Sequence, residues 1–92
     1  MNYRIEKVGK FRKYKPIYGK KTPIEAGTSV KLIFKILDNH HEGTNAERLW
    51  VKVESINGSD IVGTIDNDPV AVDLKNRDVV NFKVNNIFDI ES

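Results

Sequence analysis

Short runs in which apolar and polar residues alternate constrain this fold most, because two residues is the side-chain period of a β-strand. In the clearest run, residues 30–37, one face is entirely apolar and the other is half apolar, which predicts a central strand covered on both sides. Residues 49–56, 61–65 and 79–84 alternate in the same way. This pattern, without a convincing helical period, is typical of an all-β protein.

Glycine, proline and asparagine separate these runs and predict their connections. Residues 57–58 (Asn-Gly) lie between two alternating runs and predict a hairpin with a type I′ turn. Gly63 predicts a bulge or a close approach of another backbone. Residues 66–69 (Asp-Asn-Asp-Pro) predict a tight turn, residues 70–72 a short strand, and residues 22–27 a single helical turn.

Together these signals predict a small, mainly antiparallel barrel or sandwich of five to six short strands. The first strand lies around Tyr3 and Ile5, and residues 87–90 form the last strand or a packed coil. The 92 residues are expected to form a single domain, with a basic N-terminal segment (1–22) and a β-rich core (27–90). The predicted core residues are Val30, Leu32, Phe34, Val51, Val53, Ile61, Ile65, Val80, Phe82 and Ile87.

Charge is distributed unevenly along the chain, although the net charge is only +2. Residues 1–35 carry ten basic and two acidic side chains, a net charge of +8. Residues 36–92 carry five basic and eleven acidic side chains, a net charge of −6. The basic half could attract a polyanion or an acidic partner. It is interpreted first as solvated or as packing across the acidic half of the same molecule.

The residue types needed for common chemistry are missing or isolated. The sequence has no cysteine, which excludes disulfides, thiolate metal sites and cysteine catalysis. Asp66 and Asp68 alternate like calcium ligands, but the glycine and the distant glutamate of a calcium loop are missing, so an Asx turn is expected. No nucleophile motif or phosphate-binding loop occurs. We therefore expect a non-enzymatic protein without a cofactor or a metal ion.

No apolar run approaches the roughly 18 residues that suggest a membrane-spanning helix. Residues 1–6 lack the apolar stretch of a signal peptide. These observations predict a cytoplasmic protein without a membrane partner.

Trp50 is the large side chain whose placement bears most on function. By alternation it shares a strand face with Lys52 and Glu54, and an exposed tryptophan beside charged residues is typical of a protein-binding surface. His40 and His41 lie in the preceding polar loop. Adjacent residues point apart, which favours loop histidines beside this surface over metal ligands. Tryptophan is also routinely a core residue, and the apolar Ile56 on the same face favours the interpretation of Trp50 as part of the core over the exposed one.

Binding of another protein is thus the preferred hypothesis, and nucleic-acid binding is the alternative. Basic and aromatic residues are interleaved in the N-terminal segment, and this combination neutralises phosphates and stacks on bases in many single-strand binders. The residues of this alternative are Arg4, Lys10, Phe11, Arg12, Lys13, Tyr14, Lys15, Lys20 and Lys21.

The C-terminal two thirds of the chain carry a series of motifs in a recognisable order. They are Glu47-x-Leu49-Trp50-Val51, then Gly63-x-Ile65-x-Asn67-x-Pro69, then Leu74-Lys75-x-x-Asp78-x-Val80-x-Phe82. Over residues 27–90 the chain resembles a bacterial family of small uncharacterised proteins, the YegJ-like domain of unknown function.

The resemblance implies no activity, substrate or cofactor. It implies a partner-binding role of the adaptor, inhibitor or immunity type. Arg77 stands where the family pattern has glycine, so this turn is expected to differ or to hold a non-glycine residue at positive φ. The basic segment 1–22 lies outside the pattern, and the Gly63–Pro69 motif is interpreted as structural.

Overall fold

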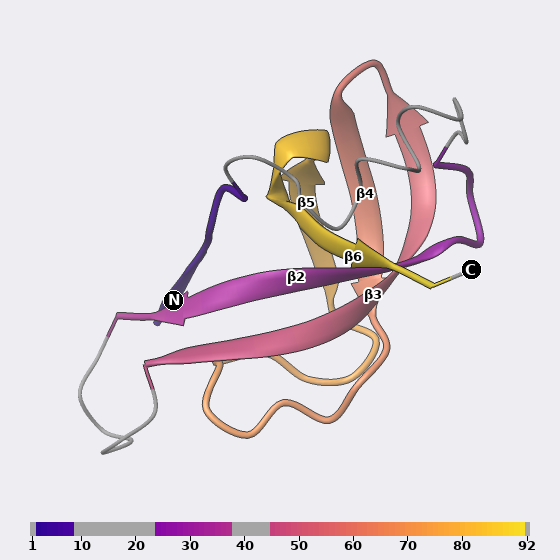
Figure 1. Cartoon of the computed structure of the whole chain (residues 1–92). Coiled ribbons are helices and arrows are strands. Elements are labelled where there is room, and N and C mark those ends of the chain that lie inside the picture. The colour runs from indigo at the N-terminus through magenta and orange to yellow at the C-terminus, as the bar shows by residue number, and fades with distance from the viewer. Residues whose placement is uncertain (1, 9–23, 38–44, 92) are drawn as a thin grey trace.

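The computed structural model describes residues 2–8, 24–37 and 45–91. These residues form one antiparallel sheet of six strands that curves into a nearly closed barrel (Figure 1). The all-β prediction is confirmed, and the sheet forms a barrel rather than a sandwich. The elements in chain order are β1 (Tyr3–Ile5), β2 (Ser29–Ile36), β3 (Ala46–Asn57), β4 (Asp60–Ile65), β5 (Val79–Lys83), the 3₁₀-helix η1 (Val84–Asn86) and β6 (Ile87–Ile90).

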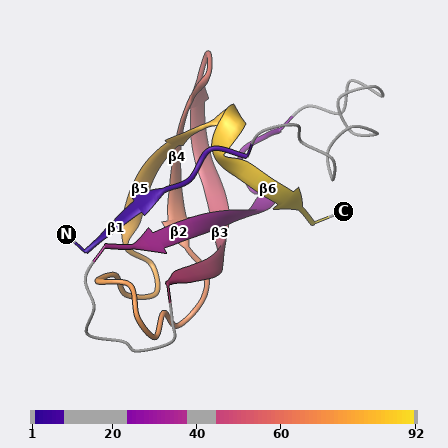
Figure 2. The same ribbon diagram turned by 60° about the vertical axis from the view of Figure 1, so that its left-hand side comes forward.

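Strand β2 lies at the centre of the sheet, as its two faces predicted. Along one edge it pairs with β3, from Ser29 opposite Lys52 to Lys35 opposite Ala46. Its other edge is shared, because β6 pairs with the first half of β2 and β1 with the second half (Figure 2). The inward side chains of β2 are buried and its outward side chains are partly buried.

A hairpin joins β3 to β4, but it turns one residue later than predicted. Asn57 pairs with Asp60, so the loop residues are Gly58 and Ser59. Gly58 has a φ of +66° and Ser59 has no positive φ, which fits a type II′ turn instead of the predicted type I′ turn. The same hairpin contains a bulge in β3 near Glu54, where the pairing with β4 shifts by one residue.

Gly63 lies opposite this bulge, and other atoms approach it closely. A Cβ atom on residue 63 would lie 2.5 Å from Val51 Cγ1, 2.8 Å from the Lys52 carbonyl oxygen and 3.1 Å from Phe82 Cε1. Of the two alternatives predicted for this position, the close approach occurs at Gly63 itself, whereas the bulge lies in the partner strand β3, and only glycine fits here without displacing β3.

Inward side chains of β2 to β6 fill the barrel, and every predicted core residue is buried. The buried core also includes the inward side chains of Ile36 on β2 and Leu49 on β3. Ala71 and Val72, from the segment between β4 and β5, complete it. This segment, residues 66–78, closes one end of the barrel (Figure 1).

Residues 70–72 do not form the predicted strand. Their N–H groups all donate to the Glu47 carboxylate instead of to a neighbouring strand, so the chain bends here. The local alternation of apolar residues predicted a strand. Hydrogen bonds to Glu47, more than twenty residues away in the sequence, stabilise a bend there instead.

The predicted helical turn at residues 22–27 falls partly outside the described residues, and the described part is a β-turn. Thr28 N–H donates to the Glu25 carbonyl oxygen (3.0 Å), and Gly27 between them has a φ of +94°. A left-handed glycine before Thr28 breaks the helical conformation that residues 22–27 would need. The single helical turn among the described residues is η1.

Candidate functional site

Aromatic and basic side chains gather on the outer face of β2, β3 and β6. We call this surface the Trp50 face and define it by Lys31, Lys35, Arg48, Trp50, Lys52 and Phe88. Lys31 and Trp50 are directly opposite each other in the β2–β3 pair, and Lys31 Nζ lies 4.7 Å from the centre of the Trp50 ring. Arg48 Cζ lies 5.4 Å from the centre of the Phe88 ring. Both distances fall within the range of cation–π contacts.

Strand alternation places Trp50 on this outer face. Leu49 and Val51 point into the barrel and are buried, so Trp50 points outward, where it is partly buried. Trp50 N–H donates to Asn67 Oδ1, and Asp66 N–H donates to the Trp50 carbonyl oxygen (2.9 Å). These two hydrogen bonds hold the strand at this position.

The interpretation of Trp50 as a core residue is therefore wrong. Ile56, which favoured that interpretation, is itself 39% exposed. The bulge in β3 reverses the alternation, so Ile56 lies opposite the buried Ile61 on the inward side of the sheet and does not share a face with Trp50.

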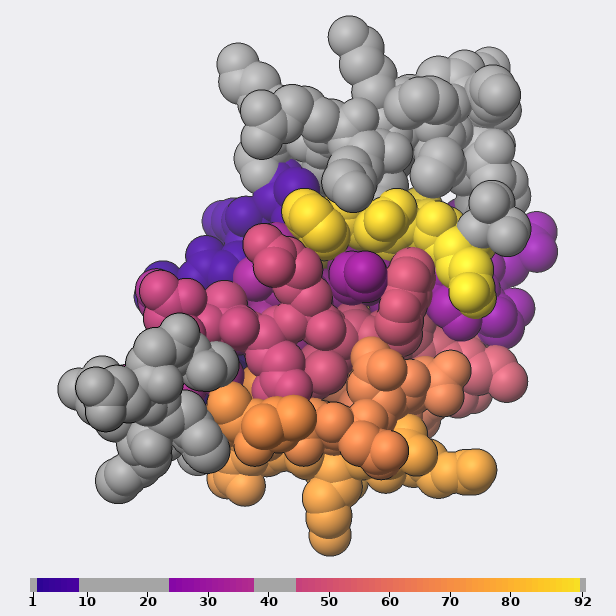
Figure 3. All heavy atoms as spheres, turned by 60° about the horizontal axis from the view of Figure 1, so that its bottom comes forward, coloured from indigo at the N-terminus to yellow at the C-terminus, as the bar shows by residue number. Residues whose placement is uncertain are grey.

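The Trp50 face is predominantly cationic. Lys31, Lys35, Arg48 and Lys52 carry its positive charge, and none of them forms an ion pair with another residue in the described part of the chain. Figure 3 shows side chains of β3 next to those of β6, with part of β2 between them. The charges therefore lie on adjoining strands and form one continuous surface.

Two carboxylates border this surface, and both accept hydrogen bonds of their own. Glu54 Oε2 accepts a hydrogen bond from Thr64 Oγ1 (2.8 Å), and Asp89 Oδ1 accepts one from Ile90 N–H (2.9 Å). Glu54 follows Lys52 along β3, and Asp89 lies directly opposite Lys31 in the β2–β6 pair, so both carboxylates reduce the local positive charge without forming ion pairs with these lysines.

The structure brings together part of the predicted protein-binding set. Trp50, Lys52 and Glu54 follow one another on the outward side of β3, as alternation predicted. His40 and His41 lie outside the described residues. Sequence analysis missed Lys31, Arg48 and Phe88, because only the pairing of β2 with β3 and β6 brings these residues next to one another.

Most of the predicted nucleic-acid-binding set lies outside the described residues. These are Lys10, Phe11, Arg12, Lys13, Tyr14, Lys15, Lys20 and Lys21. Arg4 is described: it lies on β1 directly opposite Lys35, at the edge of the Trp50 face, and forms an ion pair with Glu6 (3.1 Å).

Within the described part of the chain, the fold clearly perturbs the titration of Tyr3. Burial raises the pKa of its phenol, and the negative charges of Asp73 and Asp78 raise it further. Among residues 2–8, 24–37 and 45–91, no group of three or more His, Cys, Asp or Glu side chains could hold a metal ion. None of the helices within the same ranges is long and apolar enough to cross a membrane.

Several motif residues hold the 66–78 segment to the barrel. The Glu47 carboxylate accepts three backbone hydrogen bonds, from Val70 (2.8 Å), Ala71 (3.0 Å) and Val72 (3.1 Å). Asn67 Oδ1 accepts the hydrogen bond from Trp50 N–H. The structural interpretation of this part of the motif is consistent with these contacts.

The turn after Leu74 is also organised by a motif residue. Asp78 Oδ2 accepts a hydrogen bond from Lys75 N–H (2.8 Å), and Asp78 N–H donates to the Lys75 carbonyl oxygen (3.0 Å). Arg77 has a φ of +77°, the conformation that the glycine of the family pattern adopts without strain. The expectation of a non-glycine residue at positive φ is confirmed.

Comparison with known proteins agrees with the motif series. No curated protein and no solved structure matches the chain. A family model described as an uncharacterised protein conserved in bacteria (DUF2314) matches residues 11–91. The match starts within the basic segment, so the expectation that all of residues 1–22 lie outside the family pattern is corrected. With most of its length matched, the chain belongs to this uncharacterised bacterial family.

Proposed function

We propose that this chain is a non-enzymatic binding module that recognises another protein through the Trp50 face. The observation that carries the proposal is the position of Trp50, a large ring on the outer face of a regular strand with an ammonium group over it. Tryptophan and arginine are among the residues that contribute most to protein interfaces. Because the strand already orders Trp50, binding loses little side-chain entropy there.

Charge suggests the chemistry of the partner. Lys31, Lys35, Arg48 and Lys52 lack ion-pair partners among the described residues, so carboxylates of a partner can pair with them. We therefore expect an acidic partner surface with an apolar patch that covers the Trp50 ring. Complementary charge raises the association rate most strongly at low salt.

The proposal includes adaptors, inhibitors and immunity-type proteins, since each of these acts by holding another protein. It also includes the cytoplasmic location expected from the sequence, which fractionation of the bacterial host cells tests. A partner that is itself cytoplasmic would agree with both parts of the proposal.

The experiment is an affinity purification from nuclease-treated bacterial lysate, followed by titration of the identified partner in purified form. Two variants alter the face, Trp50→Ala and Lys52→Glu. Two controls make similar changes elsewhere: Ile56→Ala near the tip of the β3–β4 hairpin, opposite Ile61, and Lys75→Glu in the turn before β5. Thermal unfolding of each variant confirms that it folds.

The Trp50→Ala variant is expected to bind roughly 30-fold more weakly, the effect of losing one interface hot spot. Lys52→Glu is expected to weaken binding mainly through slower association, and both controls should bind like the wild type. Equal binding by all four variants would refute the Trp50 face as the site.

The nucleic-acid alternative gives the opposite result. Binding would then be lost on nuclease treatment, fall steeply with salt, and depend on Lys10, Arg12, Lys13 and Lys15 rather than on Trp50. That outcome would overturn the proposal of a protein partner.

A further inference from the structure

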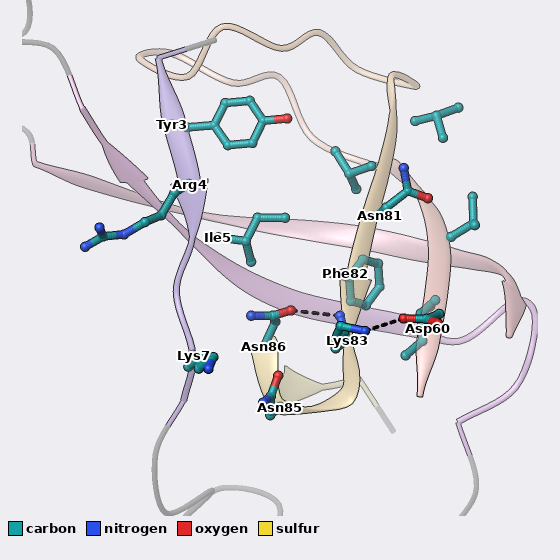
Figure 4. Close-up of a pocket in the computed structure, with 14 residues that line it drawn as sticks. Tyr3, Arg4, Ile5, Lys7, Asp60, Asn81, Phe82, Lys83, Asn85 and Asn86 are labelled. Atoms are coloured by element: carbon teal, nitrogen blue, oxygen red, sulfur yellow. Dashed lines mark hydrogen bonds and ion pairs between the residues drawn. The ribbon is translucent and has the colours of Figure 1, made fainter. Parts of the chain in front are cut away.

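Strands β1 and β5 face each other across an opening in the barrel, which we call the seam. The strand order is β1-β2-β3-β4-β5, and each strand is antiparallel to the next. Because the direction reverses at every step along this order, β1 and β5 run in the same direction. They do not pair with each other, so each has an unpaired edge on the seam (Figure 4).

The hydrogen bonds of β1 show which of its backbone groups face the seam. Glu6 N–H donates to the Ile33 carbonyl oxygen of β2 (2.9 Å). In an antiparallel pair every second residue directs its N–H and C=O groups to the partner strand, so Arg4 shares this orientation. The N–H and C=O groups of Tyr3 and Ile5 therefore turn away from β2, toward the seam.

The same argument applies to β5. Ile65 N–H of β4 donates to the Asp78 carbonyl oxygen (2.9 Å), so every second residue from Asp78 onward turns to β4. Val79 and Asn81 consequently direct their N–H and C=O groups to the seam. Two edges whose donors and acceptors have no partner among the described residues thus face the same opening.

Contacts at both ends hold the edges in this arrangement. At one end Asn2 Nδ2 donates to the Ala71 carbonyl oxygen (2.9 Å), and Asn2 Oδ1 accepts a hydrogen bond from Asp73 N–H (2.7 Å). At the other end Val8 N–H donates to the Asn85 carbonyl oxygen (2.8 Å). The seam is therefore a bounded window between two fixed strands.

A groove of about 840 Å³ lies along the seam. Tyr3 and Ile5 reach from β1 toward β5, and the Phe82 ring contributes to its apolar floor (Figure 4). Asn81 and Asn86 contribute polar groups to its lining. The groove thus offers an apolar floor for side chains and free backbone groups along its two sides.

We infer that the seam binds an extended segment of a partner protein, which adds as a strand antiparallel to both β1 and β5. A guest strand in that direction completes an all-antiparallel closed sheet, because its two neighbours run the same way. The lengths of β1 and β5 set the paired part of the guest at three to five residues. Apolar residues at alternate positions would face the floor, and proline is excluded where the guest N–H must donate.

The first measurement is amide hydrogen exchange of the free chain, followed by NMR. The amides of Tyr3, Ile5, Val79 and Asn81 are expected to exchange fast, and those of residues paired within the sheet slowly. Slow exchange at the seam amides of the free monomer would overturn the inference, because the window would then already be filled by the chain itself.

The second measurement uses a library of random twelve-residue peptides displayed on phage and selected on the wild-type chain. Asn81→Pro removes the seam-facing N–H without removing a hydrogen bond to β4, and Asn81→Ala is the matched control that keeps this N–H. Val79→Pro, at the first residue of β5, is the second backbone variant in case Asn81→Pro does not fold.

Selected peptides are expected to carry alternating apolar residues and to slow exchange at the four seam amides. Affinity should fall by up to about tenfold in Asn81→Pro and stay unchanged in Asn81→Ala. Three results would overturn the inference: no peptide that distinguishes these variants, peptides that depend on Trp50 instead, or wild-type dimers that Asn81→Pro dissociates. The second result would leave the proposed Trp50 face intact, so the two proposals fail separately.

Discussion

Replacing Glu47 with alanine is expected to destabilise the barrel strongly, because this carboxylate satisfies three backbone donors. Ala71 and Val72 are only 4% and 6% exposed, so their N–H groups have little access to water once Glu47 is removed. An unsatisfied buried donor costs about 1–3 kcal/mol, and the exposed Val70 N–H costs less since water can replace its acceptor. We expect the free energy of unfolding to fall by about 3 kcal/mol.

Urea unfolding followed by fluorescence of the single tryptophan measures this change. A chain of this length is typically stable by roughly 5–14 kcal/mol, so the variant should still fold. Glu47→Gln is expected to lose only about 1 kcal/mol, because its amide oxygen can keep the hydrogen bonds from Ala71 and Val72 while its NH₂ group faces Val70 N–H.

Glu54→Ala is the matched control. Glu54 is exposed on the same strand and accepts one hydrogen bond, so its loss should change stability by about 0.5 kcal/mol or less. The reasoning is refuted if Glu47→Ala is no more destabilising than Glu54→Ala. In that case apolar burial of Ala71 and Val72, and not the hydrogen bonds to the Glu47 carboxylate, would hold the 66–78 segment to the barrel.

Two further predictions concern packing and pH. Gly63→Ala should lower the free energy of unfolding by about 1–3 kcal/mol, because the new methyl group overlaps β3, and urea unfolding measures it. Gly58→Ala, with open space but a φ of +66°, should lose only about 1 kcal/mol, and equal losses would contradict the packing argument. Burial first, then Asp73 and Asp78, raises the pKa of the Tyr3 phenol, so the folded state keeps this proton at pH values where the unfolded chain releases it. The stability that the protonated Tyr3 phenol contributes is fully present below pH about 10. It is lost as the pH rises through the pKa of this phenol in the folded state. The free energy of unfolding of Tyr3→Phe should therefore fall less than that of the wild type between pH 10 and 12. Equal falls in the two proteins would contradict this prediction.

Local sequence patterns predicted the strands well, because burial of one strand face depends on residues two positions apart. The alternation in residues 30–37 was sufficient to predict a central strand and its buried side chains. Such patterns carry less information about exact turns. The β3–β4 hairpin turns one residue later than predicted and contains a bulge opposite Gly63, whose packing involves three strands.

Features that depend on distant contacts were beyond local patterns. Residues 70–72 alternate like a strand, but Glu47 takes their N–H groups. Lys31 and Phe88 join the Trp50 face only through the pairing of β2 with β3 and β6, which a period of two does not specify. The seam, likewise, follows from strand order and not from any single segment.

The motif series on which the sequence resemblance was based mainly describes the construction of the barrel. Glu47 and Asn67 hold the 66–78 segment, Gly63 allows close packing, and Asp78 organises a turn. Trp50 belongs to the same motif, yet its side chain is not part of the buried core and makes no hydrogen bond to the described residues. Its ring contacts a lysine on the outer face instead. A large side chain that the core does not use is available to contact another molecule, and for this reason the proposed function centres on Trp50.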